Sequence, residues 1–206
     1  MTMKKSTFRI TLLPLLFAAT FALTVSAQPI AMPDTSTPAG NRTYSNGAPQ
    51  QQIEQTRSRR TERSYYPSGG IQRESVWAMN GAKHVPERDA EYSSTGMLQR
   101  ERRWAGGEPV VELDYLASGM LVKRKEYMGM GTTRELLIQE YFSSGVLSSE
   151  ERFAVLPGGR QFPVGSQKKY GVSGNPLTEK IFDDQGKLVE EKAWNASGQL
   201  LAPNAR

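Results

Sequence analysis

Residues 170–201 read YGVSGNPLTEKIFDDQGKLVEEKAWNASGQLL and contain one short phrase three times. The glycines of this phrase are twelve residues apart, and an aromatic residue stands four positions before each: Gly174 with Tyr170, Gly186 with Phe182, and Gly198 with Trp194. Self-similarity at a fixed short period is typical of a repeat architecture, in which each unit packs against its neighbours. We therefore predict an array of β-hairpins with the glycines in turns.

The same phrase occurs earlier in the chain with longer spacers. The earlier copies are YYPSGGIQRESVW (65–77), YSSTGMLQRERRW (92–104), YLASGMLVKRKEY (115–127) and YFSSGVLSSEERF (141–153), each with a second aromatic residue eight positions after its glycine. Short polar residues followed by glycine favour a type I turn whose glycine takes the left-handed conformation, with a G1 bulge. Together with the turn signals between the copies, this pattern predicts an all-β protein with regularly spaced hairpins.

The strand after each glycine combines apolar ends with a charged middle. Because side chains alternate along a strand, we expect the second and eighth positions after the glycine, such as Leu98 and Trp104, to share one face. The other face should carry the acid at the fifth position: Glu74, Glu101, Glu150, Glu179 and Glu191. We predict an elongated, twisted, single-layer antiparallel meander with aromatic rows along its margins and Glu to Lys/Arg pairs across its strands.

The stretch GMLQRERRWAGGEPVVELDYLASG, residues 96–119, resembles the bacterial variant of the MORN repeat. This resemblance covers about residues 65–201 and implies a β-hairpin array similar to proteins described as antitoxins of the YwqK type. The chain departs from that pattern in its uneven spacers and in lacking most of the second glycines. The last three phrases, especially FDDQGKL, are also similar to the Tyr-Asp repeats of large secreted shells. Neither resemblance implies a catalytic residue.

Three segments are expected along the chain. Residues 1–27 have a basic start, an apolar run and a small-residue site ending at Ala27, which together indicate a cleaved secretory signal peptide; an uncleaved membrane anchor is the alternative. Residues 28–58, rich in Pro, Ser, Thr and Gln, are expected to be a disordered linker. Residues 59–206 form the predicted repeat domain. This organisation predicts an exported protein (periplasmic, cell-surface or secreted) without a stable membrane span after cleavage.

Composition excludes several function classes. The chain has no cysteine, so disulfides, thiol nucleophiles and thiolate metal sites are absent. The formal charge of +5 comes largely from the signal peptide; without its Lys4, Lys5 and Arg9 the chain carries 23 basic and 21 acidic residues. A nucleic-acid partner is therefore not expected. The basic stretch RSRRTER, residues 57–63, is interpreted as a solvated first strand, with an anionic partner as the alternative.

No catalytic or metal-binding motif accompanies the repeats. The only histidine, His84, is expected in a loop, and the recurring glutamates are interpreted as ladder charges rather than a glycosidase pair. We predict no enzyme activity, no metal and no cofactor. The aromatic residues at the eighth position could form a binding platform or fill the space between hairpins; these weak binding candidates are Trp77, Trp104, Tyr127, Phe153 and Trp194.

The sequence favours a non-enzymatic interaction or structural module, with another protein as partner. A cell-wall or glycan-binding module that uses the aromatic residues is the alternative, as is a short fragment of a secreted Tyr-Asp-repeat shell. If the aromatic residues fill space, Trp104→Ala should destabilise the array by about 3–5 kcal/mol. Glu101→Gln, taken as the loss of a half-exposed ladder charge, should cost about 1 kcal/mol or less.

Overall fold

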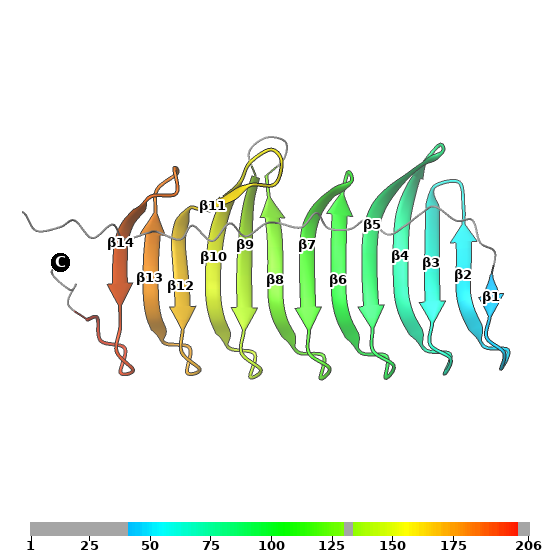
Figure 1. The fold of residues 1–206 in the computed structure, drawn as a ribbon, viewed down its shortest axis with the longest axis horizontal. Helices are drawn as coiled ribbons and strands as arrows, with labels where there is room; N and C mark the ends of the chain where they lie inside the picture. The colour runs from blue at the N-terminus through cyan, green and yellow to red at the C-terminus, as the bar shows by residue number, and fades with distance from the viewer. Residues whose placement is uncertain (1–40, 130–133, 202–206) are drawn as a thin grey trace, which may run out of the picture.

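The computed structural model describes residues 41–129 and 134–201, which form one open antiparallel sheet (Figure 1). The sheet has 14 strands, and nearly all neighbours in the sheet are neighbours in the sequence. This confirms the predicted all-β meander of hairpins. The predicted signal peptide, residues 1–27, lies outside the described residues.

The strands succeed one another with short connections. They are β1 (Arg42–Thr43), β2 (Pro49–Gln55), β3 (Arg59–Tyr65), β4 (Ile71–Asn80), β5 (Lys83–Tyr92), β6 (Leu98–Ala105), β7 (Glu108–Tyr115), β8 (Leu121–Met128), β9 (Arg134–Tyr141), β10 (Leu147–Val155), β11 (Gln161–Pro163), β12 (Gly165–Tyr170), β13 (Pro176–Phe182) and β14 (Leu188–Ala193). After β10 the returning chain is split, because β11 pairs with the end of β10 and β12 with its middle.

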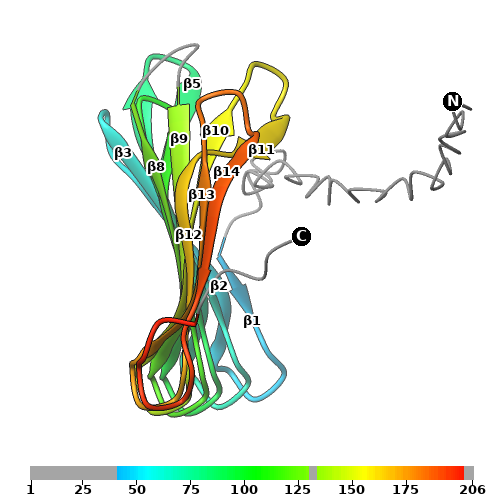
Figure 2. The ribbon, with the colours of Figure 1, turned by 90° about the vertical axis from the view of Figure 1, so that its left-hand side faces the viewer.

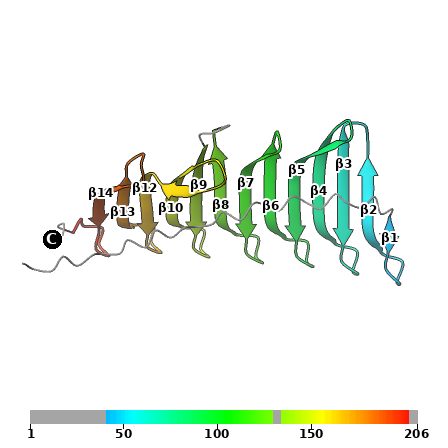
Figure 3. The ribbon, with the colours of Figure 1, turned by 45° about the horizontal axis from the view of Figure 1, so that its top comes forward.

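The sheet is a single layer, elongated along the direction in which strands are added (Figures 1 and 3). Seen along that direction, the strands turn progressively relative to one another, as the right-handed twist of strands requires (Figure 2). The described residues contain no helix. Because the described residues form no second layer above either face, the buried apolar side chains are few and lie mostly in the first half of the array: Val76, Trp77, Ala90, Trp104 and Leu136.

One turn geometry recurs along the edge at the bottom of Figure 1, here called the turn edge. In the turn that ends β5, Gly96 N donates to Ser93 O (2.9 Å) and Ser93 N donates to Met97 O (2.8 Å). Gly96 has a φ of 83°, the left-handed conformation that the sequence predicted for these glycines. The same pair of bonds closes the other turns of this edge, at residues 44–48, 66–70, 116–120, 142–146, 171–175 and 195–199.

A bulge accompanies each of these turns that joins two strands of the sheet, and it changes which face the following side chains occupy. Tyr92 pairs with Leu98, but its neighbour Glu91 pairs with Arg100, so that Gln99 is an extra residue. Adjacent residues lie on opposite faces and cross-strand partners share a face. Leu98 is therefore on the face opposite Arg100, and hence opposite Trp104, whereas we expected Leu98 and Trp104 together.

The final turns alternate between the two edges of the sheet. Gly174 and Gly198 lie on the turn edge, whereas Gly186 lies on the opposite edge, because the twelve-residue spacing leaves room for one strand between turns (Figure 1). Glu179 pairs with Lys192, which places Glu191 on the other face of the sheet. The prediction that all five acids share one face is therefore wrong for Glu191.

Two further expectations differ from the structure. The predicted linker, residues 28–58, contains β1 and β2, so the sheet extends before residue 59; the Asn46-Gly47 turn makes this hairpin despite its polar composition. His84 lies in β5 rather than in a loop, because Gly81, with a φ of 62°, allows a two-residue hairpin after Asn80. Pro86 is accommodated in that strand beside a bulge.

Candidate functional site: aromatic row and polar ladder

The two tryptophans proposed as binding residues in the centre of the array are buried. Trp77 is 2% exposed and Trp104 7% exposed, so neither offers a ring face to solvent. Each stands opposite a proline, Pro86 for Trp77 and Pro109 for Trp104, next to a bulge in the partner strand. Their burial fits the expectation that the aromatic residues fill space within the array.

The other candidate residues are half-buried, and two of them, Tyr127 and Phe153, continue the row toward the C-terminal end. The Arg134 guanidinium lies 5.0 Å from the ring centre of Tyr127 and donates to Glu108 (2.8 Å) and to the carbonyl of Pro109. Arg134 thus reaches from β9 across β8 to β7 and covers Tyr127. Further along, Phe153 stands opposite Pro163. Trp194 stands opposite Leu200 beside the 195–199 turn, on the face of Lys192, and is not part of this row. The row follows the sheet rather than converging on one site.

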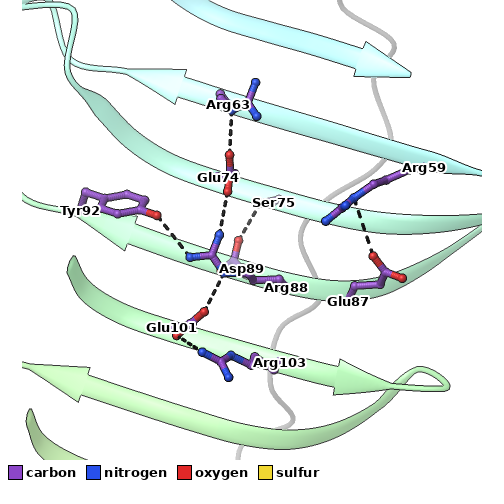
Figure 4. A network of polar contacts seen from close by, with 10 residues as sticks. All are labelled: Arg59, Arg63, Glu74, Ser75, Glu87, Arg88, Asp89, Tyr92, Glu101 and Arg103. Carbon is purple, nitrogen blue, oxygen red and sulfur yellow. Dashed lines mark hydrogen bonds and ion pairs between the residues drawn. The ribbon is translucent and has the colours of Figure 1, made fainter. Parts of the chain in front are cut away.

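A ladder of charged side chains crosses the opposite face from β2 to β6. Arg63 joins Glu54 (3.0 Å) to Glu74 (2.7 Å), and Arg88 joins Glu74 (2.7 Å) to Glu101 (2.6 Å), as Figure 4 shows for the part from Arg63 onward. Arg103 completes the ladder with a bond to Glu101 (2.9 Å), and Arg88 also donates to the Tyr92 hydroxyl (3.3 Å). This confirms the predicted cross-strand pairing of glutamate with arginine.

Glu101 is the most enclosed acid of this ladder. It is 4% exposed, and both of its oxygens accept hydrogen bonds from guanidinium groups. Burial opposes ionisation, but the bonds from Arg103 and Arg88 outweigh it and hold the pKa of the Glu101 carboxyl below its usual range. A carboxylate that stays ionised and fully paired is a poor general acid or base. Its arrangement fits a structural role.

The face that carries Trp77 and Trp104 has a second, shorter set of polar contacts. Asp89 is 2% exposed and accepts bonds from Arg73 (2.8 and 3.2 Å) and from the Ser75 hydroxyl (2.6 Å). Arg100 bonds Asp114 (2.8 Å), and Glu112 lies between Arg102 (3.8 Å) and Lys125 (3.4 Å). A single layer thus buries its central charges by pairing them on both faces.

Sequence reasoning missed the residue at the centre of the ladder, Arg88. It lies in the segment KHVPERD, whose histidine was expected in a loop between two hairpins. The Asn80-Gly81 pair was the available signal, since such a dipeptide commonly joins two paired strands. The basic stretch 57–63 is divided by the structure: Arg60 is 5% exposed, Arg63 belongs to the ladder, and Arg59 approaches Glu87 at 3.9 Å.

The described residues contain no cluster of three or more side chains suited to hold a metal ion. Nor does the described part of the chain contain an apolar helix long enough to cross a membrane. The geometry offers extended surfaces and edges rather than a converging set of reactive groups.

Comparison with known proteins leaves the family open. No family model matches the chain, and the search of curated proteins found no match. Among solved structures, one similar chain is the crystal structure of a protein with unknown function from Bacteroides fragilis. The two chains are 11% identical, with a TM-score of 0.20 over 69% of this chain and 96% of the other. At this TM-score the likeness supports no argument about fold or function.

Proposed function

We propose that this chain is an exported, non-enzymatic repeat protein that binds another protein through its extended sheet. The supporting observation is the open single layer: among the described residues, no second layer covers either face of the 14-stranded sheet. Solenoid-like arrays commonly use such surfaces for recognition, because their stability depends on neighbouring repeats rather than on a central core. A narrower version of this proposal is the neutralisation of an exported toxin.

The glycan-binding alternative loses two of its residues to burial. Stacking on a sugar requires an accessible ring face, which Trp77 and Trp104 do not present. Tyr127, Phe153 and Trp194 remain candidates, each half-buried. The shell-fragment alternative has no further observation in its favour.

The test is capture of the partner from the native envelope, with the exported protein expressed from its own host and crosslinked in place. We expect a defined protein to be recovered with the wild-type chain. Recovery of peptidoglycan instead, in a pull-down that Tyr127→Ala and Trp194→Ala weaken, would favour the glycan alternative. Robust hydrolysis of a common ester, glycan or peptide substrate by the purified protein would overturn the non-enzymatic assignment.

A further inference from the structure

The two ends of the sheet are built differently. At the first end, β1 has two residues, β2 begins at Pro49, and the Asn41 side chain accepts a bond from Ile53 N (3.1 Å). These features blunt an edge strand against further pairing. At the other end, β14 has six residues, and exposed aliphatic side chains gather around it: Leu177, Leu188, Val189, Leu200 and Leu201.

The outer side of β14 is the side that faces away from β13. The described residues cover this side only at the C-terminal end of the strand. Trp194 N donates to Leu177 O of β13 (2.9 Å), and Leu201 N donates to Ala193 O from the other side (2.8 Å). Because successive residues of a strand direct their backbone groups to opposite sides, Glu191 directs its N–H and C=O away from β13. Within the described part of the chain, residues 188–192 have no strand on this side.

The charges of β14 are paired on one side only. In the interior of the sheet an acid can receive a base from each neighbouring strand, as Glu74 does from Arg63 and Arg88, both at 2.7 Å. On β14, Glu191 receives Lys180 at 3.5 Å from β13, and Glu190 contacts Lys192 of its own strand at 3.1 Å. The side chains of Glu190 and Glu191 are about half exposed, at 50% and 47%.

We propose that the outer edge of β14 binds an extended segment of the partner protein by strand addition. The proposal rests on the proposed function and names the surface that performs it. The segment would run antiparallel to β14, with basic residues opposite Glu190 and Glu191 and an acidic residue opposite Lys192. Aliphatic residues would follow opposite Val189 and Leu188. Backbone bonds supply such binding, and the alternating side chains supply its specificity.

The test uses the full mature chain and two synthetic peptides. The first, acetyl-Glu-Lys-Arg-Val-Leu-Thr, begins opposite Lys192 and has the charges expected of the partner segment; the second, acetyl-Lys-Glu-Glu-Val-Leu-Thr, reverses them. We expect the first peptide to bind roughly tenfold more tightly, since three opposite pairs of charges become like pairs in the second. In the double variant Glu190→Lys/Glu191→Lys the preference should invert. Amide exchange should show protection of the Glu191 N–H when the first peptide is bound.

Glu135→Lys, an exposed reversal on β9, is the matched control and should leave both affinities unchanged. Equal affinity for the two peptides, no binding at all, or an unprotected Glu191 amide would overturn the proposal. Concentration-dependent dimerisation abolished by Glu190→Lys/Glu191→Lys would also overturn it, because the occupant would then be a second copy. If an envelope protein is captured equally well by the wild type and this variant, the edge proposal fails while the proposed binding function stands.

Discussion

At the scale of single residues, the turn glycines also make room for the neighbouring hairpin. A β-carbon built on Gly119 would lie 2.5 Å from Met97 Cε, the side chain that follows the glycine of the preceding turn. The same arrangement places Met120 near Gly145 and Val146 near Gly174. From the turn of Met97 to the turn of Gly174, successive turns therefore contact one another, with a side chain of one turn lying against the glycine of the next.

Replacing Gly96 or Gly119 by alanine distinguishes the cost of a left-handed backbone from the cost of displacing a neighbouring side chain. Gly96 and Gly119 share a φ near 83°, but a β-carbon on Gly96 would meet nothing within 4 Å. Gly96→Ala should cost about 1–2 kcal/mol from its left-handed backbone alone. Gly119→Ala should cost about 0.5–1.5 kcal/mol more, because Met97 must leave its rotamer. Denaturant unfolding measures the cost of each substitution. In a Met97→Ala background the two costs should become equal. Equal costs with Met97 present would contradict the contact between successive turns.

Glu101 is more buried than the sequence predicted. The sequence placed it at mid-strand and predicted a half-exposed charge, but neighbouring side chains cover it to 4% exposure. Glu101→Gln leaves Arg88 and Arg103 without their shared carboxylate. We therefore raise the expected cost to about 1–3 kcal/mol, the range for a lost charged bond at a buried site. An effect as small as that of Glu135→Gln, an exposed control on β9, would show that the ladder adds little.

The lowered pKa of Glu101 sets the direction in which the stability of the chain changes with pH. Its carboxyl has a lowered pKa in the folded chain, so the folded state favours the ionised form. The resulting stability is fully present above the unfolded pKa of about 4.3 and is lost as pH falls through the folded value. Urea unfolding between pH 6 and 3 should show that the free energy of unfolding falls more steeply with decreasing pH for the wild type than for Glu101→Gln. Parallel curves would mean that other carboxylates dominate the acid response.

At the scale of strands and turns, sequence periodicity predicted the hairpins but not the bulges. The aromatic-x-x-x-Gly phrase is local, and its turn geometry follows from the conformational freedom of glycine at positions such as Gly96. The extra residue at Gln99 depends on how two strands pair, which simple alternation cannot reveal. For this reason Leu98 was predicted on the wrong face. The prolines opposite Trp77 and Trp104, which also lie beside bulges, were not predicted.

The candidate site was predictable to a similar extent. Its residue types and ladder pairing were visible in the repeats, whereas burial was not, because it depends on long arginine side chains that cover their neighbours. Arg134, for example, covers Tyr127 from a strand away. The same reasoning identified Glu191 as a ladder acid but could not place it on the opposite face, since that required knowing which edge each turn occupies.

The aromatic residues at the eighth position predict a gradient of stability along the array. Trp104→Ala should cost about 3–5 kcal/mol, the range for truncating a buried aromatic residue, because the described part of the chain provides no second layer to fill the space. Trp194→Ala should cost clearly less, since Trp194 is half-buried and lies beside the last strand. The measurement is denaturant unfolding of both variants, compared where the dependence of the unfolding free energy on denaturant concentration is the same. If Trp104→Ala unfolds like the wild type but loses its partner, the row is a binding surface rather than a filler.

At the scale of the whole molecule, stability should be close to a sum of terms between neighbouring strands. β1 and β2 therefore matter more than their polar composition suggests. Arg60 and Arg63 of β3 donate to Gln55 (3.3 Å) and Glu54 (3.0 Å) of β2, and the Tyr44 hydroxyl donates to Tyr65 O (2.7 Å). The first hairpin thus covers charges that β3 would otherwise expose on its outer side.

This leads to a prediction about where the folded unit begins. A chain of residues 41–206 should unfold cooperatively and resist protease from its first strand. A chain of residues 59–206, the boundary expected from composition, should be less stable by about 1–3 kcal/mol, because the buried guanidinium of Arg60 loses its β2 partner Gln55. Urea unfolding of the two chains is the measurement, with Gln55→Ala in the longer chain as the control for that bond. Equal stability would mean that β1 and β2 are not part of the cooperative sheet, and cleavage between residues 44 and 58 under native conditions would support the same conclusion. If the shorter chain is destabilised and Gln55→Ala reproduces only part of the loss, the remainder belongs to the Glu54 and Tyr44 contacts.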